Sequence, residues 1–172
     1  MRRTAELGLM LALALILSYV ESMIPFSFGI PGIKLGLPNL IVLLLLYEKP
    51  NAGGEREALL VNVLRIVLSG FLFSSLYTIL YALAGAAFSF AAMALGRRTK
   101  RFSMIGVSVF GGVFHNVGQL LVAMAVVETL AVAYYVPFLI VAGTVTGAVL
   151  GIAGTTLLPY LRRLEEEREQ RK

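Results

Sequence analysis

Long apolar runs alternate along the chain with short links that are rich in glycine, proline or charged residues. A helix needs ~20 predominantly apolar residues to cross a bilayer. The runs therefore predict six helical spans, over residues 4–24, 37–47, 58–71, 76–95, 103–127 and 136–158. The second run is short, and we expect that span to include residues 33–36 as well.

The links predict where the chain turns. Polar residues around Pro50 and Gly53 predict a turn over residues 48–57, and a second turn is expected over residues 128–135. Ser69-Gly70 and Ser74-Ser75 predict a tight reversal. A charged, helix-prone tail over residues 162–172 is expected to follow a single membrane domain, residues 1–161.

Composition supports an all-α integral membrane protein. The chain has 172 residues, of which 58% are hydrophobic and 15% are charged, whereas soluble domains have roughly 25% charged residues. The absence of cysteine excludes disulfides, thiolate metal sites and cysteine nucleophiles. We expect no bound metal and no cofactor.

The basic residues predict how the bundle is oriented. With six spans, the clusters at residues 2–3, 49–56, 97–101 and 162–172 fall on one side of the membrane. Basic residues are typical of cytoplasmic links, so both termini are expected to be cytoplasmic. The basic pI of about 9.7 is therefore interpreted as membrane topology, and no nucleic-acid partner is expected.

The link between the first two spans, Glu21–Asn39, is unusually apolar for a loop. Its prolines and glycines prevent a continuous helix. One interpretation is a loop over residues 25–37 that caps a binding cavity and that includes Phe26, Phe28, Pro31 and Gly32. The alternative is an interfacial turn that only joins two spans.

Polar side chains inside apolar runs are the candidate site residues. Such groups are costly in a membrane and usually face a cavity or a partner. Arg65 lies in mid-span with Asn62 on the same face, and His115 and Gln119 share a face of the fifth span. We expect a substrate site in the outer half of the bundle formed by Glu21, Lys34, Asn39, Arg65, Tyr77, His115, Asn116 and Gln119. The alternative is a structural network in which Glu21 pairs with Arg65 and the amides bond one another.

Small residues recur at four-residue spacing, which lets helices approach closely in lipid. The pattern includes Gly85 with Ser89, and Gly143, Gly147 and Gly151. In the first span, Gly8 and Ala12 show the same spacing. They predict either packing within the bundle or a docking face for another membrane protein.

No catalytic constellation is found. The chain has no Walker loop, so it does not hydrolyse ATP itself. It also has no aspartate, and magnesium sites that handle diphosphates are usually built from carboxylates. We therefore expect that the chain is not an enzyme.

Several motifs together resemble the Gx transporter family, which is also labelled heptaprenyl diphosphate synthase component I. They are Glu21-x-x-Ile-Pro25, Pro31-Gly-Ile-Lys-Leu-Gly-Leu-Pro-Asn39, Arg65 with Gly70, and His115-Asn-x-x-Gln119. The resemblance covers about Thr4 to Leu161, and Pro38 departs from it where a small residue is expected. This family is related to the substrate-binding S components of energy-coupling factor (ECF) transporters.

The resemblance implies a six-span bundle in the bacterial cytoplasmic membrane with an outer loop that closes over a small organic nutrient or cofactor precursor. It also implies that Gly8 and Ala12 dock a transmembrane coupling protein, which works with two ATPases. Two other functions remain open. One is a membrane subunit of polyprenyl or quinone biosynthesis, and the other is a membrane scaffold for a redox protein.

Overall fold

The structure, a computed structural model, describes residues 2–24, 35–48 and 52–170. Within these residues the chain is all helical and contains no strand. The elements are α1 (Arg2–Met23), α2 (Asn39–Glu48), α3 (Ala52–Phe73), α4 (Leu76–Arg98), α5 (Met104–Val127), the 3₁₀ helix η1 (Leu130–Tyr135) and α6 (Val136–Gln170).

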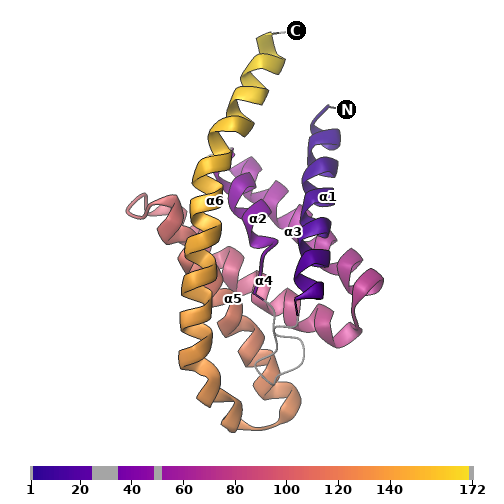
Figure 1. Cartoon of the computed structure of the whole chain (residues 1–172), viewed down its shortest axis with the longest axis vertical. Helices are drawn as coiled ribbons and strands as arrows, with labels where there is room; N and C mark the ends of the chain where they lie inside the picture. Colours follow the sequence, from indigo (N-terminus) through magenta and orange to yellow (C-terminus); the bar gives the residue numbers. More distant parts are fainter. Residues whose placement is uncertain (1, 25–34, 49–51, 171–172) are drawn as a thin grey trace.

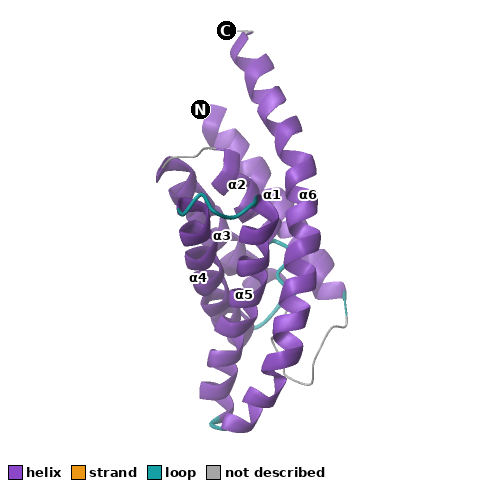
Figure 2. Ribbon diagram, turned by 90° about the vertical axis from the view of Figure 1, so that its left-hand side faces the viewer, coloured by secondary structure: helices purple, strands orange, loops and turns teal. Residues whose placement is uncertain are grey.

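The helices form one elongated bundle with both ends of the chain on the same side (Figure 1). The last part of α6 extends beyond the other helices at that end, as the view turned by 90° also shows (Figure 2). The α4–α5 pair and the α5–α6 pair make the most extensive helix contacts, whereas α1 packs mainly on α3. One side of α1 therefore has no neighbour among the described helices.

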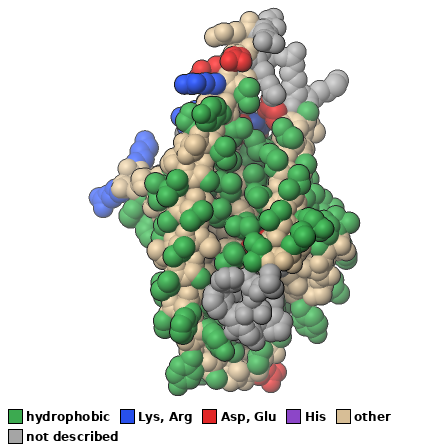
Figure 3. Space-filling view, in the orientation of Figure 1, with side chains coloured by type: hydrophobic (Ala, Val, Ile, Leu, Met, Phe, Trp, Pro, Cys, Tyr) green, Lys and Arg blue, Asp and Glu red, His purple; other side chains and the backbone are tan. Residues whose placement is uncertain are grey.

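Within the described residues, four helical segments are long and apolar enough to cross a membrane, namely α1, α4, α5 and η1 together with α6. At 1.5 Å per residue, the 10 residues of α2 span only about 15 Å, roughly half of a bilayer core. The surface along the bundle is mostly hydrophobic, and charged side chains gather mainly toward the end with both termini (Figure 3). The fold is that of an apolar, multi-pass membrane protein.

The short helix α2 lies at the centre of the larger core. Residues 41–46 are all buried, which agrees with a helix that is apolar on every side. α2 packs chiefly against α3 and α6, and its leucines meet Met10 and Ala14 of α1 in the same cluster. Because α2 is enclosed, its two ends must find hydrogen-bond partners from the surrounding protein.

Arginines from two other helices bind the C-terminal end of α2. The Arg97 guanidinium donates to the Leu46 carbonyl, and Arg162 Nη2 donates to the Tyr47 carbonyl at 2.9 Å. The last carbonyls of a helix have no partner within the helix and carry partial negative charge, so cations stabilise them. Arg97 and Arg162 thereby join α4 and α6 to α2.

A third arginine, Arg3 of α1, connects α1 to the C-terminal end of α2 and to α3. Arg3 makes two contacts of 3.1 Å with the Glu48 carboxylate and a 2.9 Å contact with Glu57. Glu6 also accepts from Arg3, at 3.1 Å. This paired geometry is the strong form of an arginine–carboxylate contact.

Backbone contacts between glycines explain the close approach of α5 and α6. A methyl group at Gly143 would lie 2.7 Å from the Gly112 carbonyl oxygen, and one at Gly147 would lie 2.6 Å from Cα of Val109. These contacts leave no room for a side chain. For this part of the chain, the expected packing of small residues within the bundle is confirmed.

The prediction of a turn over residues 48–57 is wrong for most of that range, because α3 already begins at Ala52. Its first turn contains Glu55, whose carboxylate suits the positive end of a helix. Arg98 Nε donates to Glu55 at 3.1 Å, and this hydrogen bond lowers the pKa of Glu55 below its ordinary value. Polar residues that suggested a loop instead form the first turn of a helix, where Glu55 pairs with Arg98.

Three other boundaries also differ from the sequence prediction. Residues 130–135 of the expected turn form η1, and the tail continues α6 to Gln170 as one helix that includes Pro159. The second helix begins at Asn39 rather than near residue 37, since Gly36 and Pro38 precede it in a tight turn.

We expect Gly147→Ala to lower the melting temperature of the purified protein in detergent by roughly 5 °C, because the added methyl group forces α5 and α6 apart. Gly8→Ala is the matched control, since nothing lies within 4 Å of a methyl group there. It should leave the melting temperature unchanged or slightly higher, because alanine favours a helix. Equal melting temperatures for the two variants would contradict the close packing of α5 and α6.

Candidate functional site

Glu21, near the end of α1, holds the chain that leads into α2. Its Oε1 accepts hydrogen bonds from the backbone N–H groups of Gly36 and of Leu37, the latter at 3.2 Å. Glu21 and Gly36 are buried. An unsatisfied N–H costs several kcal/mol in an apolar environment, so this carboxylate fixes where the turn lies.

The turn from Gly36 to Asn39 has the geometry that glycine permits. Gly36 has φ +82°, in the left-handed region, and the Asn39 N–H donates to the Gly36 carbonyl at 2.9 Å. Pro38 fills the turn and is fully buried. The turn therefore delivers the Asn39 side chain to the interior at the first position of α2.

The Asn39 amide is buried, with 5% of the residue exposed. Neither its oxygen nor its nitrogen has a hydrogen-bond partner among the described residues. An amide has two donors and an acceptor with two lone pairs, and leaving buried polar groups unpaired is unfavourable. Asn39 is thus a group in the interior that is free to bind a ligand or water.

His115 lies between two glycines from different elements. A methyl group at Gly36 would lie 3.4 Å from His115 Nε2, and one at Gly85 of α4 would lie 3.0 Å from His115 Nδ1. The same position at Gly85 lies 2.9 Å from Cγ of Gln119. His115 and Gln119 therefore face α4 together, and the histidine ring borders the turn that carries Asn39.

Asn116 lies on a different side of α5. Its Nδ2 donates to the Leu139 carbonyl of α6 at 2.8 Å. The structure thus places Asn116 at the α5–α6 contact, where it joins two helices, rather than beside His115 and Gln119. The expectation that the amides bond one another is not what the described residues show.

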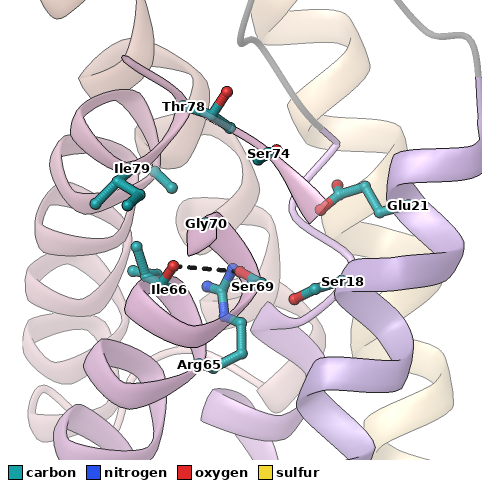
Figure 4. A pocket seen from close by; sticks show the side chains of 10 residues that line it. Ser18, Glu21, Arg65, Ile66, Ser69, Gly70, Ser74, Thr78 and Ile79 are labelled. Carbon is teal, nitrogen blue, oxygen red and sulfur yellow. Dashed lines mark hydrogen bonds between the residues drawn. The ribbon is translucent and has the colours of Figure 1, made fainter. Parts of the chain in front are cut away.

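Arg65 of α3 is buried and its Nη2 donates to Asn62 Oδ1 at 2.6 Å, as their spacing on one helical face predicts. Its Nε has no partner among the described residues. Arg65 lines a small pocket between α1, α3 and α4, and Glu21 and Ser18 point into this pocket from α1 (Figure 4). The pocket is lined by Ser18, Glu21, Arg65, Ile66, Ser69, Gly70, Ser74, Thr78, Ile79 and Ala82.

The pocket combines opposite charges with several hydroxyl groups. Arg65 and Glu21 contribute a cation and an anion, and serine and threonine side chains line the pocket with them. The cavity volume is about 10 Å³, which is roughly the room that one water molecule needs. Sites for small organic ligands occupy about 300–1,000 Å³, so the walls must separate before such a ligand fits.

The predicted site residues therefore form two connected groups. Glu21 and Arg65 line the pocket. Asn39 and His115 lie at the turn that Glu21 holds, and Gln119 lies beside His115 where both face Gly85 of α4. Tyr77 is 68% exposed on the surface of α4, apart from both groups. Lys34 and the predicted capping residues Phe26, Phe28, Pro31 and Gly32 lie outside the described residues.

Sequence reasoning missed the hydroxyl groups of the pocket. Ser18 lies three residues before Glu21, and Ser69 lies four residues after Arg65. Residues at these spacings share a helical face, so the helical period could have found both. On α4, Thr78 lines the pocket, whereas its neighbour Tyr77 does not.

The described helices, with polar side chains enclosed between them, define a membrane protein with a polar interior. Residues 10–157 match the family model described as heptaprenyl diphosphate synthase component I, so the chain belongs to that family. This is the family also labelled Gx transporter, and the family prediction made from the sequence is confirmed. Comparisons with curated proteins and with solved structures gave no significant match.

We expect Glu21→Ala to release the turn before α2, because two buried N–H groups lose their acceptor. The chain has no native cysteine, so Leu37→Cys provides a single reporter thiol. Its maleimide labelling rate should rise roughly tenfold in Glu21→Ala, since ~1.4 kcal/mol of lost stabilisation corresponds to that factor. Glu21→Gln, which keeps an acceptor oxygen, should label near the original rate.

An unchanged labelling rate in Glu21→Ala would show that other contacts hold the turn. A rate in Glu21→Gln as high as in Glu21→Ala would show that the charge of Glu21, rather than its hydrogen bonds, fixes the turn.

Proposed function

We propose that the chain is the substrate-binding component of an ECF-type uptake transporter for a small organic nutrient or cofactor precursor. The observation that carries the proposal is the enclosed polar interior of an otherwise apolar bundle. Asn39 offers both amide atoms there, and Arg65 offers a buried Nε. Polar groups at such depth in a membrane protein typically serve a ligand or transport path.

The charged and polar residues of the site indicate which kind of ligand it would bind. Arg65 and Lys34 favour an anionic or electron-rich part of the ligand, while Asn39, His115 and Gln119 supply hydrogen bonds. Phe26 and Phe28 supply stacking surfaces. Glu21 already accepts two backbone N–H groups, so its main part is to hold the turn.

Ligand binding requires the pocket to widen, and α1 is the wall best suited to move. α1 packs mainly on α3 and otherwise makes small contacts with α2. A shift of α1 carries Ser18 and Glu21 away from Arg65 and changes the position of the turn at Gly36. The same helix presents Gly8 and Ala12 on its exposed side, where nothing lies within 4 Å of a methyl group at Gly8.

In this proposal the exposed face of α1 docks a transmembrane coupling protein, and partner ATPases supply the energy. The bundle crosses the bacterial cytoplasmic membrane six times, with α2 and the residues before it forming one crossing. Both termini then face the cytoplasm, as their common side in Figure 1 supports. The chain itself performs no catalysis in this arrangement.

The family description favours a second candidate, a membrane subunit that supports prenyl diphosphate synthesis. In that case, a soluble partner provides the catalytic carboxylates, because this chain contains no aspartate. This candidate requires prenyl transfer activity when the two proteins are mixed. The enclosed polar interior gives it no specific support.

We expect Arg65→Ala to lose the ligand while the protein stays folded. Wild-type protein is purified from its native membrane, and small molecules released by denaturation are identified by mass spectrometry. The same molecule should be absent, or reduced by tenfold or more, in Arg65→Ala, because a charged hydrogen bond contributes about 1.5–3 kcal/mol. Arg56→Ala, which removes an exposed arginine of the same helix, is the matched control.

Folding of each variant is checked by its melting temperature and its elution from a sizing column. Equal ligand content in folded Arg65→Ala and in wild type would assign Arg65 a purely structural part.

A further inference from the structure

The link between α4 and α5, residues 99–103, is a fixed projection of the bundle. Lys100 has φ 55° and ends α4 in the left-handed conformation, while Thr99 Oγ1 donates to the Gly96 carbonyl at 2.7 Å. Ser103 begins α5 by accepting from the Gly106 N–H at 3.2 Å. Both helix ends are capped, so the backbone of the link is held in place.

This link carries positive charge that nothing in the described chain neutralises. Lys100 and Arg101 are exposed, and their side chains make no hydrogen bond or ion pair with the residues that the structure describes. The preceding arginines differ, because Arg97 and Arg98 both contact Glu55, at 3.5 Å and through a short ion pair. Lys100 and Arg101 are therefore available for an external anion.

Apolar side chains border the two free cations. Phe102 is 45% exposed and packs edge-on against Phe110 with ring centroids 4.8 Å apart. Leu95, one turn before the end of α4, is 62% exposed. In the space-filling view, blue side chains stand out at the side of the molecule beside a hydrophobic surface (Figure 3).

The position of the link relative to the membrane identifies the partner. It joins two helices that are each long and apolar enough to cross a bilayer, so residues 99–103 lie where a span meets the headgroups. Lysine and arginine at this level attract anionic headgroups, and aromatic side chains favour the same layer. Exposed apolar side chains beside cations at this level match the boundary between headgroups and acyl chains, which favours a lipid over a soluble partner.

We propose that residues 99–103, together with Leu95, form a binding site for the headgroup and upper acyl chain of an anionic phospholipid. Lys100 and Arg101 bind the phosphate, and Phe102 and Leu95 contact the chain below it. This site is separate from the polar interior and does not depend on the transport proposal.

The test titrates the purified full-length protein in neutral detergent with phosphatidylglycerol and counts bound lipid by native mass spectrometry. Each basic residue near a membrane surface contributes about 1 kcal/mol, or about fivefold. Lys100→Gln with Arg101→Gln should therefore weaken phosphatidylglycerol binding by tenfold or more and leave phosphatidylcholine binding unchanged. The control, Arg56→Gln with Arg163→Gln, makes the same change in net charge at other exposed positions and should weaken it less than threefold.

Three results would overturn the proposal. Equal weakening in the two double variants would show a diffuse charge effect. Displacement of the lipid by excess inorganic phosphate would show that a free anion is the ligand. Unchanged lipid binding in Lys100→Gln/Arg101→Gln, with loss of a co-purifying acidic protein, would assign the link to a protein partner.

Discussion

The contact between the Glu21 carboxylate and the backbone of Gly36 and Leu37 determines where the polar interior lies. In an apolar bundle, backbone N–H groups that leave a helix must find an acceptor inside the protein. Glu21 provides it from the end of α1, and Gly36 permits the sharp turn because it adopts positive φ. The turn brings Asn39 inward and lies against the His115 ring. One carboxylate thus links the position of α1 to the groups that would contact a ligand.

The helix that follows this turn, α2, is also bound at its C-terminal end. Arg97 and Arg162 bind the last carbonyls of α2, and Arg3 binds Glu48 with two parallel contacts. The buried helix α2 therefore connects the polar interior to the charged end of the bundle, where α1 also begins. A change in the turn at Gly36 has a direct structural route to the end of the protein where a coupling partner would dock.

The sequence predicted an all-helical chain with several membrane-crossing helices, because its apolar runs are long and sharply interrupted. It misplaced the start of α3, since ion pairs with Arg98 and Arg3 allow Glu55 and Glu57 to begin a helix. Helical spacing correctly paired Arg65 with Asn62, but it could not reveal that Asn116 faces α6. Which side of a helix meets which neighbour depends on tertiary packing, and here glycines at the α5–α6 contact decide it.

The most direct test of the proposed transport function is purification of the tagged protein from its native membrane in mild detergent, with mass spectrometry of the proteins that accompany it. We expect a transmembrane coupling protein and ATPases to co-purify with wild type. Gly8→Leu with Ala12→Leu should lose them, because both positions lie on the open side of α1, while Ile16→Leu on that side should retain them. Recovery of a prenyl synthase or a redox protein, with no ATPase, would contradict the transport function.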